Sequence, residues 1–284
     1  MYKLLSDGVT NHKIKKNIKE GYNTYSLNFA HSDLSGFNVC PKANKLTEQE
    51  QNKNKSNCSS CCVGYNGFAS IHSSIIESRI KKTLSYFLDK ESFLNSLVYE
   101  IQKAIEQSNK KGLKPSFRLN AYSDIRLEND VIPITYERYK KEFPNNKLLK
   151  KFFKEDGLNV AYGNIFILFP NVDFYDYTKL LNRKVPKNYQ LTFSHHNADF
   201  IETTQALESG LNVAIVFEEL PKFIRVNKIK YHVIDGDKTD LRLDEKVNNK
   251  NVVVGLKFKG SKAKLNNALN EGFCIAKNNN SLTY

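Results

Sequence analysis

Residues 189–217 read YQLTFSHHNADFIETTQALESGLNVAIVF, and this stretch decides the fold class. Two short segments rich in β-branched and aromatic residues, 189–194 and 212–217, are typical of buried strands. Between them lies ADFIETTQALESGL, which reads as a helix that ends at Gly210. A strand, a crossover helix and a second strand form the unit from which parallel sheets are built. The stretch therefore predicts two parallel strands joined by a helix.

The same alternation extends over most of the chain. One helix is expected over residues 70–88, where large apolar side chains recur at helical spacing, and a second from Asp89 to a stop at Gly112. Short strands separated by crossovers predict an α/β fold with a mostly parallel sheet, shaped as an incomplete (β/α) barrel. A doubly wound open sheet is the alternative. The other expected strands are 22–29, 116–120, 172–179, 231–235 and 252–256.

The composition limits the class of protein. With 284 residues, 40% hydrophobic residues, 18 Phe and 15 Tyr, the chain can form a core as one barrel-like domain or two smaller domains. No run approaches the roughly 18 consecutive apolar residues of a membrane-spanning helix, so no membrane partner is expected. The formal net charge of +13 favours an anionic partner, either a small molecule or nucleic acid. The lysines are scattered, which weakens the case for direct nucleic-acid binding.

Four of the five cysteines lie close together in the sequence, in NVCPKA and, after a polar stretch, in NCSSCCVGYNG. Three or four thiolates from one loop suit zinc or an iron–sulfur cluster. The intervening KLTEQEQNKNKSN has almost no apolar side chains, so an ordered loop needs something such as a metal to hold its ends together. The candidate metal ligands are Cys40, Cys58, Cys61 and Cys62.

The sequence leaves the kind of centre open. The N-terminus has no apolar secretory segment, so we expect a cytoplasmic protein with reduced thiols, which makes disulfides the weaker alternative. Zinc prefers two Cys-x2-Cys pairs or one pair with spaced histidines, and only the pair Cys58 and Cys61 is present. A three-cysteine site for a [4Fe-4S] cluster fits at least as well as zinc. Incidental thiols are the remaining alternative.

Polar residues follow nearly every expected strand. In parallel α/β folds, ligands bind at the C-terminal ends of the strands, where the loops converge. A single polar residue at a strand end is more often a surface residue than a functional one, but its repetition over five or six strands gives the functional interpretation equal weight. The candidate substrate-binding residues are Asn120, Asp124, Lys179, Ser194, His195, Asp235 and Asp237.

Several common catalytic and nucleotide-binding signatures are absent from the sequence. It has no G-x-S-x-G elbow, no P-loop and no dinucleotide fingerprint. The run DGDKTD at 235–240 resembles the start of a calcium loop but lacks the glycine and the final glutamate at EF-hand offsets. His195 and His196 would face opposite sides of a strand, so only one of them could enter a site. No catalytic residue is therefore assigned.

Several segments resemble a family of phage-encoded proteins. SGFNVCPKA, CSSCCVGYNG and the helix containing ESRIKKT resemble that family's N-x-C-P-x-A element, its Cys-x3-Cys with a following glycine, and its R-x-x-K/R-T helix. Further segments resemble it in the same order, so the resemblance covers roughly residues 22–276. The chain also resembles the broader gene-product-eighty-eight-like phage proteins. The further segments are FRLNAYSDI, VDFYDYTK, VPKNYQLTFS, GLNVAIVF, VIDGDKTDLR and VVGLKFKG.

The resemblance implies a phage origin and a location in the host cytoplasm, but no activity by itself. Its pattern matches Cys40, Cys58 and Cys62, leaves Cys61 as an extra cysteine, and is interrupted by an insertion at roughly 45–56. Cysteines ahead of a helix and barrel-like strands resemble the layout of radical S-adenosylmethionine enzymes. The Cys-x3-Cys-x2-Cys spacing of those enzymes is absent here, so the similarity is one of architecture.

These observations give a leading expectation and two alternatives. Residues 1–69 are expected to carry the cysteine-rich metal-binding loop, and residues 70–284 the barrel-like α/β domain, as one continuous structural unit. The leading expectation is a radical-SAM-like enzyme with a [4Fe-4S] cluster and S-adenosylmethionine, acting on a nucleotide or nucleic-acid substrate. The runner-up is a non-enzymatic, zinc-stabilised protein that binds nucleic acid or a host protein. A metal-free phosphate-handling enzyme comes third.

Overall fold

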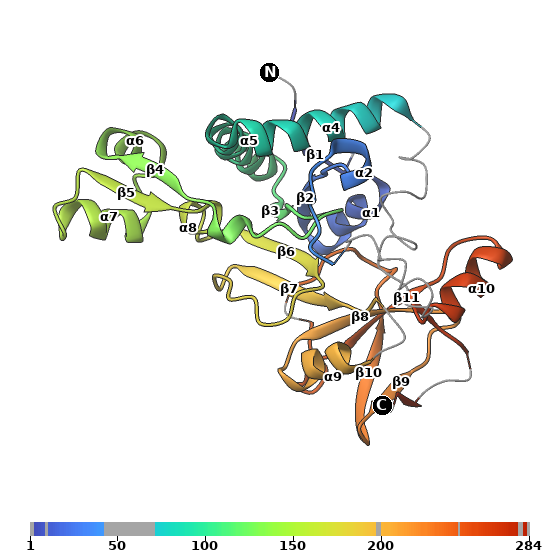
Figure 1. The fold of residues 1–284 in the computed structure, drawn as a ribbon. Coiled ribbons are helices and arrows are strands. Elements are labelled where there is room, and N and C mark those ends of the chain that lie inside the picture. Colours follow the sequence, from blue (N-terminus) through green and yellow to red (C-terminus); the bar gives the residue numbers. More distant parts are fainter. Residues whose placement is uncertain are drawn as a thin grey trace.

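The computed structural model describes residues 3–8, 11–42, 72–196, 200–243, 245–277 and 281–282. Its central element is a large, mostly parallel sheet that does not close (Figure 1). The described strands lie in the order β1-β2-β3-β6-β7-β8-β11-β10-β9-β13, and β12 pairs with β8. The expected α/β fold with an open, mostly parallel sheet is confirmed. The strands are β1 Leu5–Ser6, β2 Tyr22–Leu27, β3 Lys114–Arg118, β6 Asp173–Thr178, β7 Tyr189–Ser194, β8 Asn212–Phe217, β9 Phe223–Val226, β10 Ile229–Asp235, β11 Val253–Lys257, β12 Cys274–Ile275 and β13 Ser281–Leu282.

The strand order resembles part of a barrel. Every neighbouring pair from β2 to β10 along this order is parallel, whereas β1 pairs with β2 and β9 with β10 in antiparallel fashion. From β2 to β8 the spatial order follows the chain order, so each crossover advances in the same direction. A doubly wound sheet instead reverses direction at a switch point near its middle. The expected incomplete barrel therefore describes this part of the sheet better than the doubly wound alternative.

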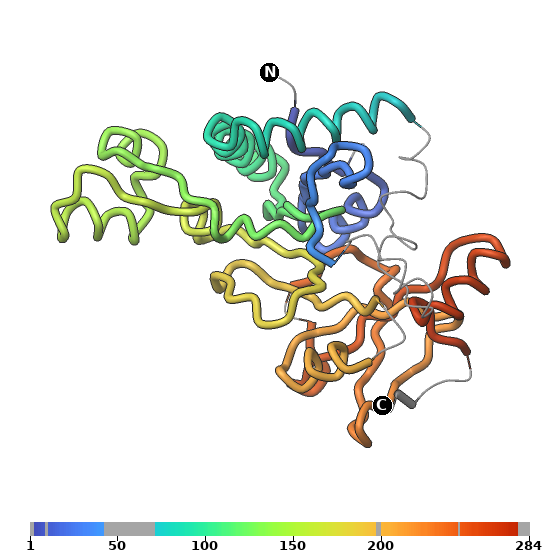
Figure 2. Tube along the Cα trace, viewed as in Figure 1, coloured from blue at the N-terminus to red at the C-terminus, as the bar shows by residue number. Residues whose placement is uncertain are grey.

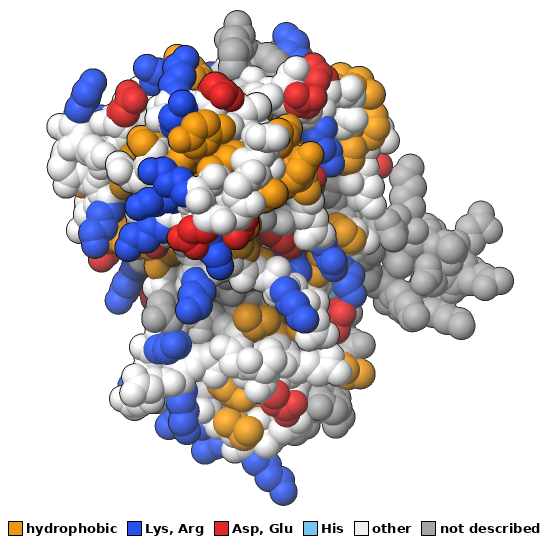
Figure 3. Space-filling view, turned by 90° about the vertical axis from the view of Figure 1, so that its left-hand side faces the viewer, with side chains coloured by type: hydrophobic (Ala, Val, Ile, Leu, Met, Phe, Trp, Pro, Cys, Tyr) orange, Lys and Arg blue, Asp and Glu red, His pale blue; other side chains and the backbone are white. Residues whose placement is uncertain are grey.

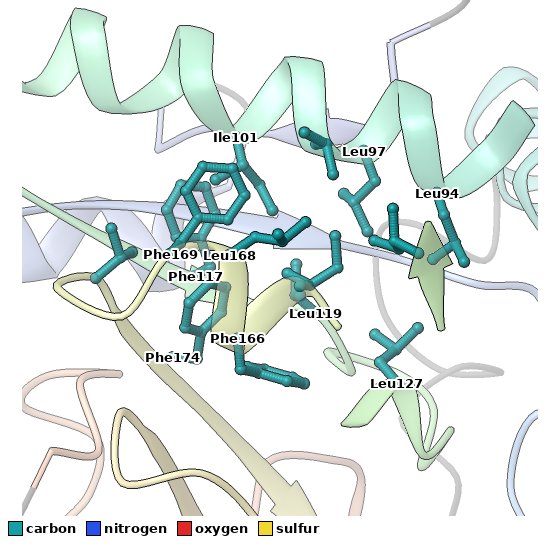
Figure 4. Packing of buried hydrophobic residues seen from close by; sticks show 14 of the residues in the cluster. Leu94, Leu97, Ile101, Phe117, Leu119, Leu127, Phe166, Leu168, Phe169 and Phe174 are labelled. Atoms are coloured by element: carbon teal, nitrogen blue, oxygen red, sulfur yellow. The ribbon is translucent and has the colours of Figure 1, made fainter. Parts of the chain in front are cut away.

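Two long helices, which lie between β2 and β3 in the sequence, cover one face of the sheet. They are α4 (Ser73–Leu88) and α5 (Lys90–Lys110), and the Asp89 side chain caps α5 by accepting the N–H of Ser92. Gly112 adopts a positive φ of 66° just beyond α5, which favours the residue without a Cβ. Figure 4 shows the apolar stripe of α5 packed on the sheet, on helix α8 (Ile165–Leu168) and on the residue that follows it. The labelled residues are Leu94, Leu97, Ile101, Phe117, Leu119, Leu127, Phe166, Leu168, Phe169 and Phe174.

A second apolar cluster lies at the C-terminal half of the sheet. Helix α9 (Ile201–Glu208) connects β7 to β8, as the sequence predicts, and buries Ala206 and Leu207 against Phe193 and Ile215. Strands β9 and β10 form a hairpin that adds Ile224, Val226 and Tyr231 to this cluster. Alternate residues of a strand face opposite sides of the sheet. Because these apolar side chains are buried on the α9 side, the residues between them face the other side.

The opposite face of the sheet is buried but polar. Residues on β2, β3 and β6 point toward helix α1 (His12–Lys15), the 3-10 helix η1 (Lys16–Glu20) and residues 239–242. Nδ2 of Asn17 donates to Thr24 Oγ1 (2.8 Å) and to the hydroxyl of Tyr175 (2.9 Å). Arg118 pairs with Asp240 at 2.7 Å. The polar face is made of Thr24, Ser26, Ser116, Arg118, Tyr175 and Tyr177, with Asn17, Asp240 and Arg242 packed over it.

Residues 132–163 form an arm that projects from the sheet (Figures 1 and 2). The arm lies between β3 and β6 in the sequence and was not expected from it. Its two strands pair only with each other, in antiparallel fashion, so they stay outside the main sheet. The arm contains β4 (Ile132–Thr135), α6 (Tyr136–Glu142), α7 (Lys147–Lys154) and β5 (Val160–Gly163).

The remaining described elements are short. They are η3 (Leu127–Asn129), α2 (Ser32–Ser35) and α10 (Lys262–Asn270). Because β1 and β2 belong to the main sheet, residues before position 69 contribute to the same sheet as the residues after it. Within the described ranges, none of the helices has the length and apolarity needed to cross a membrane.

Candidate functional site

Asp124 joins the loop after β3 to the end of β6. Its carboxylate accepts the hydroxyl of Thr178 at 2.9 and 3.1 Å and the backbone N–H of Lys179 at 2.8 Å. It also accepts Nη1 of Arg183 at 2.6 Å. Asp124 is only 3% exposed. This predicted site residue thus lies at the expected strand end, with both carboxylate oxygens occupied by internal donors, so in this structure it positions the ends of β3 and β6.

Arg183 lies in the same ion-pair network, and the sequence did not predict it as a site residue. Its guanidinium makes a bidentate pair with Glu128 (2.9 and 2.6 Å) in addition to its contact with Asp124. Burial alone would lower the pKa of Arg183, but the hydrogen bonds and charge of Glu128, with Tyr189 and Asp124, raise it instead. Burial raises the pKa of Asp124, and the opposing contributions come from the Lys179 backbone, Arg183 and Thr178. Arg183 therefore keeps two buried carboxylates paired.

Lys179 and Ser194 are neighbours across β6 and β7. Nζ of Lys179 lies 3.2 Å from Oγ of Ser194 and 3.4 Å from its carbonyl oxygen. The register pairs Thr178 with Phe193, which brings the next residue of each strand together as well. Among the described residues no carboxylate lies within ion-pair distance of Lys179. Its ammonium group can therefore balance the charge of an anionic ligand.

The two histidines after β7 have different partners. Both ring nitrogens of His195 are engaged: Nδ1 lies 2.8 Å from Thr203 Oγ1, and Nε2 lies 2.8 Å from the carbonyl oxygen of Gly272. The carbonyl can only accept, so Nε2 carries the proton and Nδ1 accepts the threonine hydroxyl. Burial lowers the pKa of His195 to about 3, which keeps the ring neutral. His195 thus ties β7 to α9 and to the loop before β12, while its predicted contact with substrate stays a prediction.

His196 is also neutral at pH 7, and it is connected to the cysteine segment through Glu202. Burial, helped by Lys179, lowers its pKa to about 4. Its Nε2 lies 3.4 Å from one carboxylate oxygen of Glu202 on α9, and Nζ of Lys42 lies 2.7 Å from the other. The side chain of Glu202 therefore connects the end of β7 to a residue two positions after Cys40.

Cys40 lies beside these strand ends because the chain around it is attached on both sides. The carbonyl of Val39 accepts the backbone N–H of Asp124 at 2.9 Å, and Lys42 pairs with Glu202. Val39 is 3% exposed and belongs to the apolar cluster under α4 and α5. Cys40 therefore follows a residue that is bonded to the Asp124 loop, and its role as a metal ligand stays a prediction. The other candidate ligands, Cys58, Cys61 and Cys62, lie outside the described residues.

The donor chemistry of Cys40 fits a zinc or iron–sulfur centre, because thiolate is the preferred ligand of both. Within the residues that the structure describes, no group of three His, Cys, Asp or Glu side chains is arranged to hold a metal ion. A centre at Cys40 therefore needs ligands from the cysteines at 58–62. Cys274 is a different case, because it is 3% exposed in β12, where burial raises the pKa of its thiol to about 12.

Asp176 and Asn120 connect β3 to β6 beyond the point where the two strands stop pairing. Asp176 was not among the predicted site residues. The Asp176 carboxylate accepts the backbone N–H groups of Leu119 (3.1 Å) and Asn120 (3.0 Å) and the hydroxyl of Tyr189 (3.1 Å). Burial raises the pKa of Asp176 to about 7, against the effect of Arg118. The Asn120 side chain accepts the hydroxyl of Ser123 and the N–H of Ile125, which shapes the loop that carries Asp124. A carboxylate inside a central strand, in FYDYT, is the signal that could have identified Asp176.

Asp235 and Asp237 lie at the end of β10, three strands away from β7 in the sheet order. Asp237 accepts Nζ of Lys259 at 2.6 Å and the backbone N–H of Lys257 at 3.1 Å, and Asp235 accepts the N–H of Asp237. Nζ of Lys16 donates to the Asp237 carbonyl at 2.6 Å. The structure thus divides the predicted set into one group at the ends of β3, β6 and β7 and another at the end of β10. The first group includes Cys40.

The chain belongs to the family described as Gene product 88, a family of phage-type proteins, whose model matches residues 3–277. This match covers nearly the whole chain and confirms the resemblance found in the cysteine segment and the later strands. No curated protein and no solved structure matches the chain.

Proposed function

We propose that this member of the Gene product 88 family is an enzyme with a thiolate-bound metal centre above the strand ends of its sheet. In this proposal the centre is a [4Fe-4S] cluster held by Cys40, Cys58 and Cys62, with Cys61 as a substitute or fourth ligand. The substrate is a nucleotide or nucleic acid in the host cytoplasm. The observation that carries the proposal is the attachment of the Cys40 segment to Asp124 and Glu202.

The position of Cys40 supports an enzyme because parallel α/β folds place their reactive groups at the C-terminal ends of the strands. A cysteine staple that served only to hold a surface loop would not need to lie there. Lys179 lies at the same ends without a carboxylate partner in the described part of the chain, and it can bind an anionic group of the substrate. A bound iron–sulfur cluster supplies one-electron chemistry, for which S-adenosylmethionine is the expected co-substrate.

The residues around Cys40 hold the site in one geometry. Asp124 and Arg183 fix the loop after β3 against β6, and His195 fixes the end of β7 against Thr203. The histidines are neutral and Lys42 is paired with Glu202, so Lys179 is the cation of this group without a carboxylate partner among the described residues. A rigid strand-end site with one such ammonium group is suited to orienting a phosphorylated substrate.

The metal content tests this proposal directly. Protein purified without oxygen is expected to be brown, with broad absorbance near ~400 nm and bound iron and sulfide, because thiolate-to-iron charge transfer follows from such ligands. Cys58→Ala should lose the metal, whereas Cys274→Ala, with its thiol buried in β12, should keep it. Protein that carries neither iron nor zinc would contradict both this proposal and the alternative below.

The arm gives specific support to a second candidate function, a zinc-stabilised protein that binds nucleic acid. Helix α7 exposes Lys147, Lys150, Lys151 and Lys154, and the described residues provide no ion-pair partner for any of them. Figure 3, which looks onto the side from which the arm projects, shows Lys and Arg side chains spread over that face. Colourless protein with one zinc, whose nucleic-acid affinity falls steeply with salt and is lost when the α7 lysines are changed to Glu, would favour this function.

A further inference from the structure

Two buried cations lie on consecutive turns of α4. Arg79 is 8% exposed and Lys82 is 4% exposed, and both lie on the side of the helix that faces the protein. Thr83 fixes this side: its Oγ1 accepts the backbone N–H of Ala30, just after β2, at 2.8 Å and donates to the Arg79 carbonyl at 2.9 Å. The same three residues form the R-x-x-K-T pattern of the sequence ESRIKKT. The functional site described above uses none of them.

Neither cation has an acidic partner in the part of the chain that the structure describes. The guanidinium carbon of Arg79 lies over the ring of Tyr122, 4.3 Å from its centroid, and the buried Nε of Arg79 has no hydrogen-bond acceptor among the described residues. Lys82 makes no hydrogen bond or ion pair with a described residue. The nearest acidic influence on Lys82 is Glu100, whose two carboxylate oxygens accept the backbone N–H groups of Leu4 and Leu5 at 2.7 and 2.8 Å.

Proteins seldom bury positive charge without pairing it, because the lost hydration is not recovered. Here two such charges lie close enough that Arg79 disfavours the charged form of Lys82, which burial disfavours most strongly. The arrangement therefore opposes the stability of the ligand-free chain. The cation–π contact with Tyr122 uses none of the N–H donors of Arg79, so these donors are available to bind an oxyanion.

We propose that Arg79 and Lys82 form a binding site for the phosphate group of a small phosphate monoester, between α4 and the loop after β3. The planar donors of Arg79 would bind two phosphate oxygens, and the Lys82 ammonium would balance the remaining charge. Both cations are more than nine-tenths buried, which suits a terminal phosphate better than the continuous backbone of a polymer. Tyr122 lies two residues before Asp124, so the phosphate site adjoins the strand-end site. The phosphate site does not depend on the metal centre.

Calorimetric titration of the full-length protein with AMP, inorganic phosphate and adenosine tests the site. AMP and phosphate should bind and adenosine should not, and tighter binding of AMP than of phosphate identifies the monoester as the source of the anion. Lys82→Met and Arg79→Met should each weaken AMP binding by about tenfold or more, because each removes charge-assisted contacts. Lys110→Met, which removes an exposed lysine of α5, should bind AMP as the wild type does.

Thermal unfolding without ligand separates a binding role from a structural one. Lys82→Met keeps an unbranched side chain, one heavy atom shorter, and removes an unpaired charge, so its unfolding temperature should equal or exceed that of the wild type. Weaker AMP binding with an unchanged or raised unfolding temperature supports the site. If Lys82→Met does not fold, Arg79→Lys, which keeps the charge but loses the planar donors, decides by the same two measurements. Absence of AMP and phosphate binding to the wild type, or unchanged affinity in the variants, would overturn the proposal, as would lowered stability in both Met variants with unchanged binding.

Discussion

Replacement of Arg183 by Met tests whether the ion-pair network at the end of β6 organises the site. The Arg183 side chain is 1% exposed and contacts Asp124 at 2.6 Å and Glu128 at 2.6 Å. Its loss would leave two carboxylates buried without their counter-charge. Breaking a buried ion pair by removing one partner costs about 3–5 kcal/mol. Since the whole free energy of unfolding of a domain is about 5–15 kcal/mol, Arg183→Met should remove a large part of it.

Urea unfolding followed by far-ultraviolet circular dichroism measures this loss. Arg138→Met provides the control, because Arg138 makes a comparable pair with Glu142 at 3.0 Å while remaining 21% exposed, and such a pair contributes about 1 kcal/mol or less. A loss of less than about 1 kcal/mol in Arg183→Met would refute the argument. Failure of Arg183→Met to fold, under conditions in which Arg138→Met folds, would agree with it.

The pH dependence of the Arg183→Met defect follows from Asp124. Burial already raises the pKa of this carboxyl, and Arg183 is one of the groups that oppose the rise. Without Arg183 the pKa of Asp124 in the folded variant should rise further above its value in the unfolded chain. The folded variant would then bind a proton more readily than the unfolded one, so its stability should fall as pH rises through that pKa. The difference from wild type should therefore be smaller at about pH 5 than at about pH 8.

Three further outcomes are expected. Cys274 should resist alkylation by iodoacetamide at about pH 8 until the chain is unfolded, because burial raises the pKa of its thiol to about 12; rapid labelling of the folded protein would contradict its placement in β12. The wild-type urea midpoint should fall as pH drops from about 6.5 toward 4, because His195 (pKa about 3) and His196 (pKa about 4) stay neutral in the folded chain and bind protons in the unfolded one; His195→Gln should show a shallower fall, and an equal slope would exclude His195 as a cause. AMP affinity should fall as pH rises through about 8, because burial lowers the pKa of Lys82 to about 8 and the ammonium group loses its proton there. Glu100 of α5 raises this pKa, whereas Arg79 of α4 and Lys3 lower it. The variant Lys82→Met should lose this pH dependence.

The sequence predicted the central strands of the main sheet because they carry a strong local signal, but it did not predict the short strands β1, β9, β12 and β13. Strands β6, β7, β8 and β10 and helices α4, α5 and α9 lie where the pattern of apolar residues predicts them. The arm is different, because its elements are short and depend on contacts within the arm. Tyr139 of α6 stacks on Phe153 of α7 with ring centroids 5.2 Å apart, and Pro133 lies inside β4, where a proline argues against a strand.

The strand-end positions of the candidate residues were predicted, whereas their bonding partners were not, and their role in binding a substrate stays a prediction. Strand-end logic located Asp124, Lys179 and Ser194 correctly at the C-terminal ends of β3, β6 and β7. It could not show that Asp124 would be buried against Arg183, which is 59 residues away in the sequence. It also could not show that both nitrogens of His195 would be bonded to Thr203 and Gly272. Such pairings depend on the tertiary fold. A polar residue after a strand is therefore predicted to lie at the edge of the sheet, but its hydrogen-bond or ion-pair partner is not predicted.

The buried lysine of α4 gives the strongest physical reason to expect a ligand. A pKa of about 8 in the folded chain against the ordinary 10.5 corresponds to about 3 kcal/mol, by which the folded state disfavours the charged form of Lys82 at neutral pH. This contribution is fully present below about pH 8 and is relieved as pH rises toward 10.5. Replacement by methionine, an unbranched side chain one heavy atom shorter, would remove it, so stability alone gives no reason to keep a lysine there. An anion bound between Lys82 and Arg79 would reverse the sign of this free-energy contribution. The Lys82 charge destabilises the folded chain when the site is empty, and it would stabilise the complex with the anion.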